Sequence, residues 1–285
     1  MNLSYILLGL TVPICLFAKN RNLMLLAIFM TIITAYYQGI ISSTAAVGIL
    51  LFFAISYSYF NYNGLNKYLR YALFIIMLTL TAGYIFHLMP GFTNVLVINK
   101  TQVSSLSSSF SMYLNFDKTI IALILYVTSG LWMLEKSIDK KSILDTLLCL
   151  LLCIGVILIP GILSGYIKFD PKIPEILCLW VFNNLLFVSA TEEMIFRGIL
   201  QNNLKSFLGT RATNYYLHII IASIIFGLSH YKGGVTFMLL AAISGGFYGY
   251  IYDKTNRIFC ATLVHFGLNL VHLMLFTYPS AIVVY

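Results

Sequence analysis

The stretch Thr191-Glu192-Glu193-Met194-Ile195-Phe196-Arg197 places two adjacent acids inside an apolar segment long enough to cross a membrane. They are the only acids of the chain that lie well inside such a segment. A charged side chain at the centre of a bilayer costs about 2.5 to 3.5 kcal/mol, so ionisable residues there usually mark a functional site. This pair therefore indicates chemistry that takes place within the membrane.

The composition of the whole chain is that of an integral membrane protein. Hydrophobic residues make up 60% of the 285 residues and charged residues only 9%, which excludes a soluble domain. Because a membrane helix needs roughly 20 apolar residues, we expect an all-α, polytopic helical bundle with about ten transmembrane helices, and at least about eight. The candidate segments are residues 3–17, 22–40, 43–60, 70–89, 118–134, 143–164, 175–201, 213–230, 233–252 and 257–277.

Basic residues are distributed unevenly between the loops of this arrangement. Loops after odd-numbered segments hold most of them, including Lys136 and Arg211, whereas loops after even-numbered segments hold only Lys100, Lys118, Lys168, Lys172 and Lys232. Lys and Arg are retained on the cytoplasmic side of membranes. We therefore expect a multi-pass protein of the cell membrane, by its composition a bacterial inner or plasma membrane, with both termini outside.

Charge and cysteine usage argue against nucleic-acid binding and against a cysteine-based metal site. The net charge is +8, but the basic residues stand singly at segment ends rather than on one basic face. The five cysteines fall in or at the ends of apolar segments without metal-binding spacing, so we expect them to pack. The expected partners are the lipid bilayer and a peptide or protein substrate; the sequence does not indicate an oligomeric state.

One long polar interruption, residues 91–117, divides the chain. It contains the strand-like run Val95-Leu96-Val97-Ile98 and a serine-rich run, which predict a small extramembrane hairpin or a re-entrant element. We expect leading membrane helices and this loop in residues 1–117, and the functional core in residues 118–285.

The polar residues inside the later segments recur at helical spacings. Glu193 and Arg197 are four residues apart, the separation at which an acid and a base can pair on one face of an α-helix. Glu192 is rotated by about 100° from Glu193 on such a helix and points elsewhere. A buried carboxylate in that setting is suited to act as a general base.

Two further apolar segments carry groups that could serve the same reaction. His230 ends the run Phe226-Gly227-Leu228-Ser229-His230, and it could hold a water together with Glu192. His265 and Asn269 are four residues apart, so both could donate hydrogen bonds to one developing oxyanion. A single buried histidine is more often a structural residue, and only the joint occurrence of these groups favours a site.

In this order, EExxxR at Glu192, FxxxH at Phe226 and HxxxN at His265 resemble the three motifs of the CPBP family. This family includes CAAX prenyl endopeptidases of the Rce1 type and bacterial bacteriocin-processing and self-immunity proteins. The resemblance covers roughly residues 118–285 and says little about the leading helices.

The resemblance implies an all-helical intramembrane endopeptidase with a site that opens between helices. Its catalytic residues would be Glu192 and His230, which activate water, Glu193 and Arg197, which hold the helix in register, and His265 and Asn269, which stabilise the tetrahedral intermediate. It does not name the substrate or the residues that bind it.

Metal use stays open at this point. If zinc is used, Glu192, His230 and His265 would hold it and leave a fourth position for water. The motif HExxH is absent, however, and a Glu192 that acts as a base is not available as a ligand. We therefore favour metal-independent water activation, without a cofactor.

Three alternatives to the metal-independent endopeptidase remain. A protein of the same fold could act without proteolysis, as a self-immunity factor or a scaffold. A transporter would also bury Glu, Arg and His residues, but inverted repeats are not apparent. A rhomboid-type serine peptidase would use Ser244 in Ala242-Ile243-Ser244-Gly245, yet it would leave the acid pair without a role.

For several other polar residues a structural role is at least as good an interpretation as a functional one. His272 shares a helix face with His265 and could line the site or simply pack. Asn183 and Asn184 could bind substrate backbone or bond a neighbouring helix. His87 and His218 lie near segment ends and are expected at the membrane interface.

Overall fold

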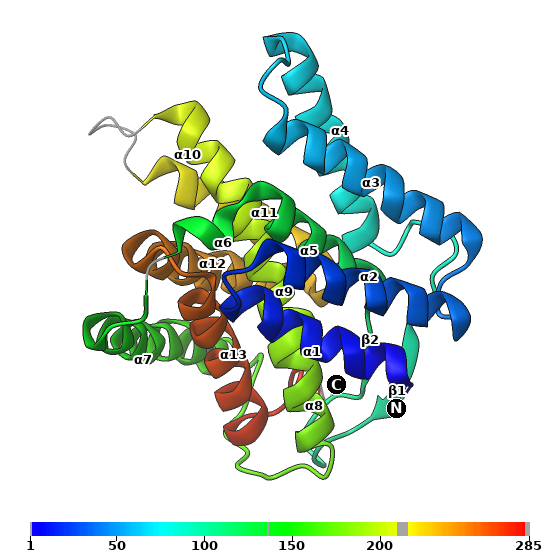
Figure 1. The fold of residues 1–285 in the computed structure, drawn as a ribbon. Helices are drawn as coiled ribbons and strands as arrows, with labels where there is room; N and C mark the ends of the chain where they lie inside the picture. The colour runs from blue at the N-terminus through cyan, green and yellow to red at the C-terminus, as the bar shows by residue number, and fades with distance from the viewer. Residues whose placement is uncertain (1, 136, 210–215, 283–285) are drawn as a thin grey trace. The chain divides into compact units, whose positions relative to one another are not determined.

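The computed structural model describes residues 2–135, 137–209 and 216–282 (Figure 1). Lys136, Arg211 and residues 213–215 of the predicted segment 213–230 lie outside these ranges. Within them the regular structure is helical apart from one two-stranded sheet. By its contacts the chain divides into two compact units that interleave along the sequence.

Unit 1 comprises Met1–Val95, Tyr113–Leu134 and Leu186–Ile195. Its helices are α1 (Leu3–Phe17), α2 (Arg21–Tyr37), α3 (Ser43–Asn61), α4 (Lys67–Ile85), α5 (Phe116–Ser129), α6 (Leu131–Leu134) and α9 (Ala190–Glu193). The side chains of Asn20, Ser42 and Asn66 each accept a hydrogen bond from the backbone N–H three residues later. Such N-caps satisfy a backbone donor that the first helical turn leaves open, and they fix where α2, α3 and α4 begin.

Helix α5 is the core of unit 1. Every residue from Phe116 to Thr128 is buried, which is the pattern of a helix enclosed on all sides. It packs against α1, α2, α3 and α4, and against α9, which carries the acid pair. The Asn61 amide donates to the carbonyl oxygen of Thr128 over 2.9 Å and ties α3 to the end of α5. The leading helices therefore enclose α5 within the unit that holds Glu192 and Glu193.

Unit 2 comprises Leu96–Met112, Glu135–Leu185 and Phe196–Tyr285. Its helices are α7 (Lys140–Leu163), α8 (Leu177–Asn183), α10 (Asn202–Leu208), α11 (Leu217–Ser229), α12 (Gly234–Thr255) and α13 (Ile258–Leu275). Helix α12 packs against α7, α11 and α13. The two units follow contacts rather than chain order, and the domain boundary between residues 117 and 118 stays a prediction.

The polar interruption at residues 91–117 contains the predicted hairpin. Strands β1 (Val95–Thr101) and β2 (Phe110–Leu114) pair with each other. Ile98 and Met112 of the hairpin form a buried cluster with Trp180 of α8 and Leu273 of α13. This apolar contact ties the hairpin to two helices of unit 2.

The segment after α13 joins the loops of unit 2 at one end. The Thr277 N–H donates to the carbonyl oxygen of Lys168 over 2.9 Å, and the Ser108 N–H donates to that of Ser280 over 2.9 Å. The hairpin loop, the loop after α7 and the segment after α13 therefore lie on the same side of any membrane that unit 2 crosses. The arrangement predicted from charge puts them on one side too, and which side faces out stays a prediction.

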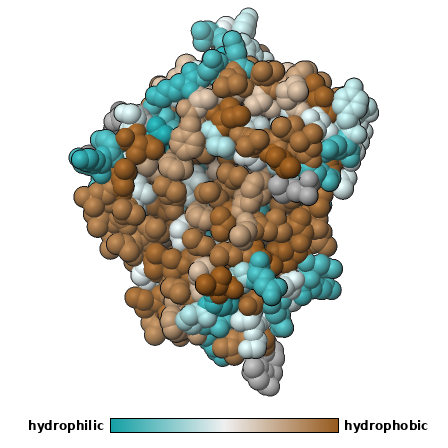
Figure 2. Space-filling view, turned by 60° about the horizontal axis from the view of Figure 1, so that its bottom comes forward, coloured by the Kyte–Doolittle hydropathy of each residue, from teal (hydrophilic) through white to brown (hydrophobic). Residues whose placement is uncertain are grey.

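The predicted membrane segments coincide with helices, but their number as membrane spans is not established. Among the described residues, five helices are long and apolar enough to cross a membrane: Ser43–Asn61, Lys67–Ile85, Lys140–Leu163, Tyr231–Thr255 and Ile258–Leu275. Three shorter apolar helices are α1, α2 and α11. Hydrophobic residues cover most of the surface visible in Figure 2, as expected for a surface in contact with lipid. The chain is thus a multi-pass helical membrane protein.

Candidate active site

The acids lie on an uninterrupted helical run from Leu177 to Leu208 that is not a uniform α-helix. The π-helices η1 (Asn184–Ser189) and η2 (Met194–Gln201) flank the single α-helical turn of α9. A π turn closes its hydrogen bonds five residues apart rather than four, and such turns are frequent at functional sites. The regular α-helical spacing assumed between Glu193 and Arg197 is therefore wrong, and their pairing stays a prediction.

Glu192 is buried and forms an ion pair that the sequence did not indicate. Its Oε1 atom lies 2.9 Å from the Nζ atom of Lys118, and the two side chains are 12% and 8% exposed. Lys118 lies in the first turn of α5 and belongs, like Glu192, to unit 1. Its assignment to a loop was wrong, because Lys118 lies within helix α5 and its ammonium group is enclosed. The side of the membrane on which this end of α5 lies stays a prediction.

Arg197 is fully buried among aromatic rings of unit 2. Its guanidinium carbon lies 5.1 Å from the ring centre of Phe226 and 5.9 Å from that of Tyr248. A cation over an aromatic face is attracted by the ring quadrupole, and more strongly where water is excluded. Arg197 thus links η2 to α11 and α12, which agrees with a role in holding the helix in place.

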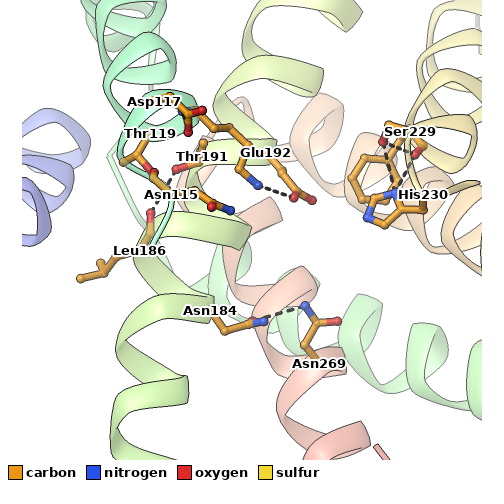
Figure 3. A network of polar contacts seen from close by, with 12 residues as sticks. Asn115, Asp117, Thr119, Asn184, Leu186, Thr191, Glu192, Ser229, His230 and Asn269 are labelled. Atoms are coloured by element: carbon orange, nitrogen blue, oxygen red, sulfur yellow. Dashed lines mark hydrogen bonds and ion pairs between the residues drawn. The ribbon is translucent and has the colours of Figure 1, made fainter. Parts of the chain in front are cut away.

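The ring of His230 is fixed at the end of α11 by the carbonyl group of Phe226. Its Nδ1 atom lies 2.8 Å from that oxygen and 3.2 Å from the Oγ atom of Ser229 (Figure 3). Because a carbonyl group only accepts hydrogen bonds, Nδ1 carries the proton. In a neutral ring Nε2 is then the nitrogen that can accept a proton or orient a water molecule.

His265 is held in the same aromatic group. Its ring stacks on that of Tyr248, with centroids 4.6 Å apart and planes inclined by 11°, and it meets the edge of Phe226 at 5.8 Å. The ring of Phe226 also lies 4.7 Å from that of His230. Phe226 therefore contacts three of the predicted site residues, His230, His265 and Arg197, and unit 2 brings these three together around one ring.

Asn269 lies one helical turn beyond His265 on α13, as predicted. Its Nδ2 atom donates a hydrogen bond over 3.3 Å to the Oδ1 atom of Asn184, at the start of η1 (Figure 3). An amide group carries two N–H donors, so this bond orients the group while a second donor remains. The position fits a donor to an oxyanion.

The predicted residues are divided between the two units. Glu192 and Glu193 belong to unit 1, whereas Arg197, His230, His265 and Asn269 belong to unit 2. The joint action of Glu192 and His230 on one water molecule therefore stays a prediction.

The remaining histidines have structural partners. His272 lies 3.1 Å from the carbonyl oxygen of Thr277 and helps to end α13. His218 contacts the Asp253 carboxylate at 3.4 Å, and His87 contacts the Asp117 carboxylate at 2.8 Å. These contacts favour the structural interpretation of all three.

A metal would have to share the Glu192 carboxylate with an ammonium ion. Like charges within a few ångströms repel strongly in a medium of low dielectric constant, so Lys118 makes this carboxylate a poor zinc ligand. In the described part of the chain, no group of three His, Cys, Asp or Glu side chains is arranged to hold a metal ion. The ion pair thus argues against Glu192 as a zinc ligand beside His230 and His265, and the use of a metal stays a prediction.

Three residues that the structure places at the site were not assigned a role there from the sequence. Lys118 was taken as a loop residue because it begins an apolar segment, where lysines usually extend to the interface. Tyr248 was not identified, because nothing in its spacing distinguishes it from the other tyrosines. Asn184 was named, and its place on the helical run that carries the acids was the available signal.

The comparisons with known proteins concern the second half of the chain. A family model described as type II CAAX prenyl endopeptidase Rce1-like matches residues 174–271. That range includes Glu192, Arg197, His230, His265 and Asn269 but not Lys118. There is no significant match among the curated proteins or among the solved structures. Residues 174–271 therefore carry an Rce1-like domain of the CPBP type.

Proposed function

We propose that the chain is an intramembrane endopeptidase that hydrolyses a peptide bond of a hydrophobic or membrane-embedded peptide or protein. The observation that carries the proposal is the ionisable group of Glu192, buried beside a counter-charge on a segment that matches the family. Enclosing two charged groups costs several kcal/mol per ion before their attraction is counted. Such an arrangement is expected where the charge has a function.

In the proposed mechanism Glu192 acts as the general base. Its carboxylate, held by Lys118, takes a proton from water, while the Nε2 atom of His230 orients that water. The water oxygen bonds to the carbonyl carbon of the substrate, and the resulting oxyanion accepts hydrogen bonds from His265 and Asn269. The carbon–nitrogen bond then breaks as Glu192 returns its proton to the leaving amine. Atoms and charge balance without a cofactor.

The other two motif residues have a supporting role in this proposal. Glu193 and Arg197 are both fully buried, and Arg197 is packed between aromatic rings. Removal of either side chain would leave the other charged group in an apolar environment without its counter-charge, so both stability and activity would fall.

The test compares the peptides of membranes from cells that express equal amounts of wild type, Glu192→Gln or Glu175→Gln, by mass spectrometry. Glu175→Gln makes the same chemical change on an exposed carboxylate and serves as the matched control. A set of peptides present with wild type and Glu175→Gln but missing with Glu192→Gln is the expected result. A chelator added to isolated membranes should leave that set unchanged.

Other outcomes have distinct meanings. Identical peptide sets for wild type and Glu192→Gln would contradict the peptidase and favour a non-catalytic immunity or scaffold protein. Loss of the set on chelation, with recovery on adding zinc, would contradict metal-independent hydrolysis. The set itself would report whether the substrate carries a prenyl group.

A further inference from the structure

The position of Lys118 is energetically unfavourable for a lysine, because its charged group is removed from water. The side chain is 8% exposed, and it extends from a helix whose residues Phe116 to Thr128 are all buried. A lysine at the edge of an apolar segment normally extends its ammonium group to the membrane surface. Here the ammonium group is turned inward, to the carboxylate of Glu192 at 2.9 Å.

The backbone around Lys118 is held by contacts on both sides. Its N–H group donates over 2.8 Å to the Oδ1 atom of Asp117, whose Oδ2 atom contacts His87 at 2.8 Å. The N–H group of Phe116 donates over 2.8 Å to the Oδ1 atom of Asn94. These bonds anchor the first turn of α5 to the residues that follow α4. The direction of the Lys118 side chain is thus set by the leading helices and their connecting loop.

We propose that Lys118 is a positioning residue of the active site, whose ammonium group holds the carboxylate of Glu192 in the orientation needed for reaction. This inference rests on the proposed function of Glu192 as the base. It gives α5 a role, because α5 lies outside the segment that matches the family and supplies the counter-charge of a residue within it. A charge-assisted hydrogen bond of this kind is short and strong, and it fixes the orientation of a carboxylate.

The activity test measures the initial rate at which isolated membranes release the peptides that Glu192→Gln abolishes. Lys118→Met removes the charge at nearly constant length and should lower the rate about 10- to 100-fold, as expected for a hydrogen bond between charged groups. Lys118→Arg keeps the charge and should retain more of the rate than Lys118→Met. Lys172→Met is the matched control, since Lys172 is a similarly enclosed lysine of unit 2 that pairs with Asp170 at 3.1 Å. The rate of this variant should equal that of wild type.

The second readout does not depend on activity. Thermal unfolding of the purified protein in detergent is measured for Lys118→Met, Glu192→Gln and the double variant. Each single change leaves one buried partner without the other, so both single variants should have a lower Tm than the double variant. Additive Tm changes would show that the two side chains do not interact and would overturn the proposal.

The outcomes separate this proposal from the proposed function. If Glu192→Gln removes no peptides while the Tm values are coupled, the peptidase assignment fails but the ion pair stands as a structural pair. If Glu192→Gln removes peptides but folded Lys118→Met keeps at least half of the wild-type rate, Lys118 is not a positioning residue. Should Lys118→Met not fold, Lys118→Gln takes its place, and failure of both to fold would assign Lys118 a purely structural role.

Discussion

Helices α11 and α12 approach closely at Gly227, one residue after Phe226, and this contact offers a sharp test of the packing. A Cβ atom built on Gly227 would lie 2.5 Å from the Cβ atom of Ala242, 2.7 Å from the carbonyl oxygen of Met238 and 2.9 Å from the Cα atom of Ala242. The Met238 oxygen and the Ala242 Cα are backbone atoms, and the Ala242 Cβ is bonded directly to the backbone. No rotamer change can therefore relieve the clash.

The cost of Gly227→Ala can be worked from these distances. Carbon atoms pack at about 3.5 to 4.0 Å, so α11 and α12 would have to separate by roughly 1 Å. Overpacking of a close contact costs about 1 to 3 kcal/mol, and alanine recovers about 0.5 to 1 kcal/mol of helix propensity. We expect a net loss of about 1 kcal/mol, which lowers Tm by about 2 to 4 °C.

The assay is thermal unfolding in detergent, with peptide release as a second readout. Gly246→Ala on α12 is the matched control, because a Cβ atom there would meet nothing within 4 Å. It should raise Tm slightly, whereas Gly227→Ala should lower it and slow peptide release by displacing His230 at the end of α11. A Tm for Gly227→Ala at or above that of wild type would refute the close packing of α11 on α12.

The other predictions concern Asn184 and Asp170. Asn184→Ala removes the acceptor that orients Asn269 and should slow peptide release about 2- to 12-fold, as expected for loss of a neutral hydrogen bond of about 0.5 to 1.5 kcal/mol; an equal loss in Asn183→Ala would contradict a specific role. Burial of Asp170 would raise its pKa, but the hydrogen bonds from Ser104 and Lys172 hold that pKa below its usual range. The carboxylate therefore stabilises the fold above about pH 4, and this contribution is lost as pH falls through the lowered pKa. Tm measured from about pH 7 to 3 should fall less for Asp170→Asn than for wild type, and parallel curves would count against this ion pair.

The helices could be predicted because hydropathy over about 20 residues is a local property. The hairpin at residues 91–117 was also predicted, since β-branched residues in Val95–Ile98 favour an extended chain within a polar loop. The motif residues were found by their order and spacing, and the family match at residues 174–271 agrees with them.

The geometry along the acid-bearing helix could not be predicted in the same way. Sequence periodicity assumes a constant angle per residue, and the π turns at Asn184–Ser189 and Met194–Gln201 break that assumption. Such turns are stabilised by the packing around them rather than by the residue types they contain. The face on which each acid points therefore depends on tertiary contacts.

By itself the sequence determined a multi-pass helical membrane protein with an acid pair buried in its second half. This was possible because the length of an apolar segment and the presence of a charged residue within it are both visible in the local sequence. Only the tertiary structure decided that Lys118 is the partner of Glu192, although the two residues lie 74 positions apart. A lysine at a segment end has the same local sequence whether it extends to the membrane surface or turns inward. The helices packed around α5 determine which of the two it does.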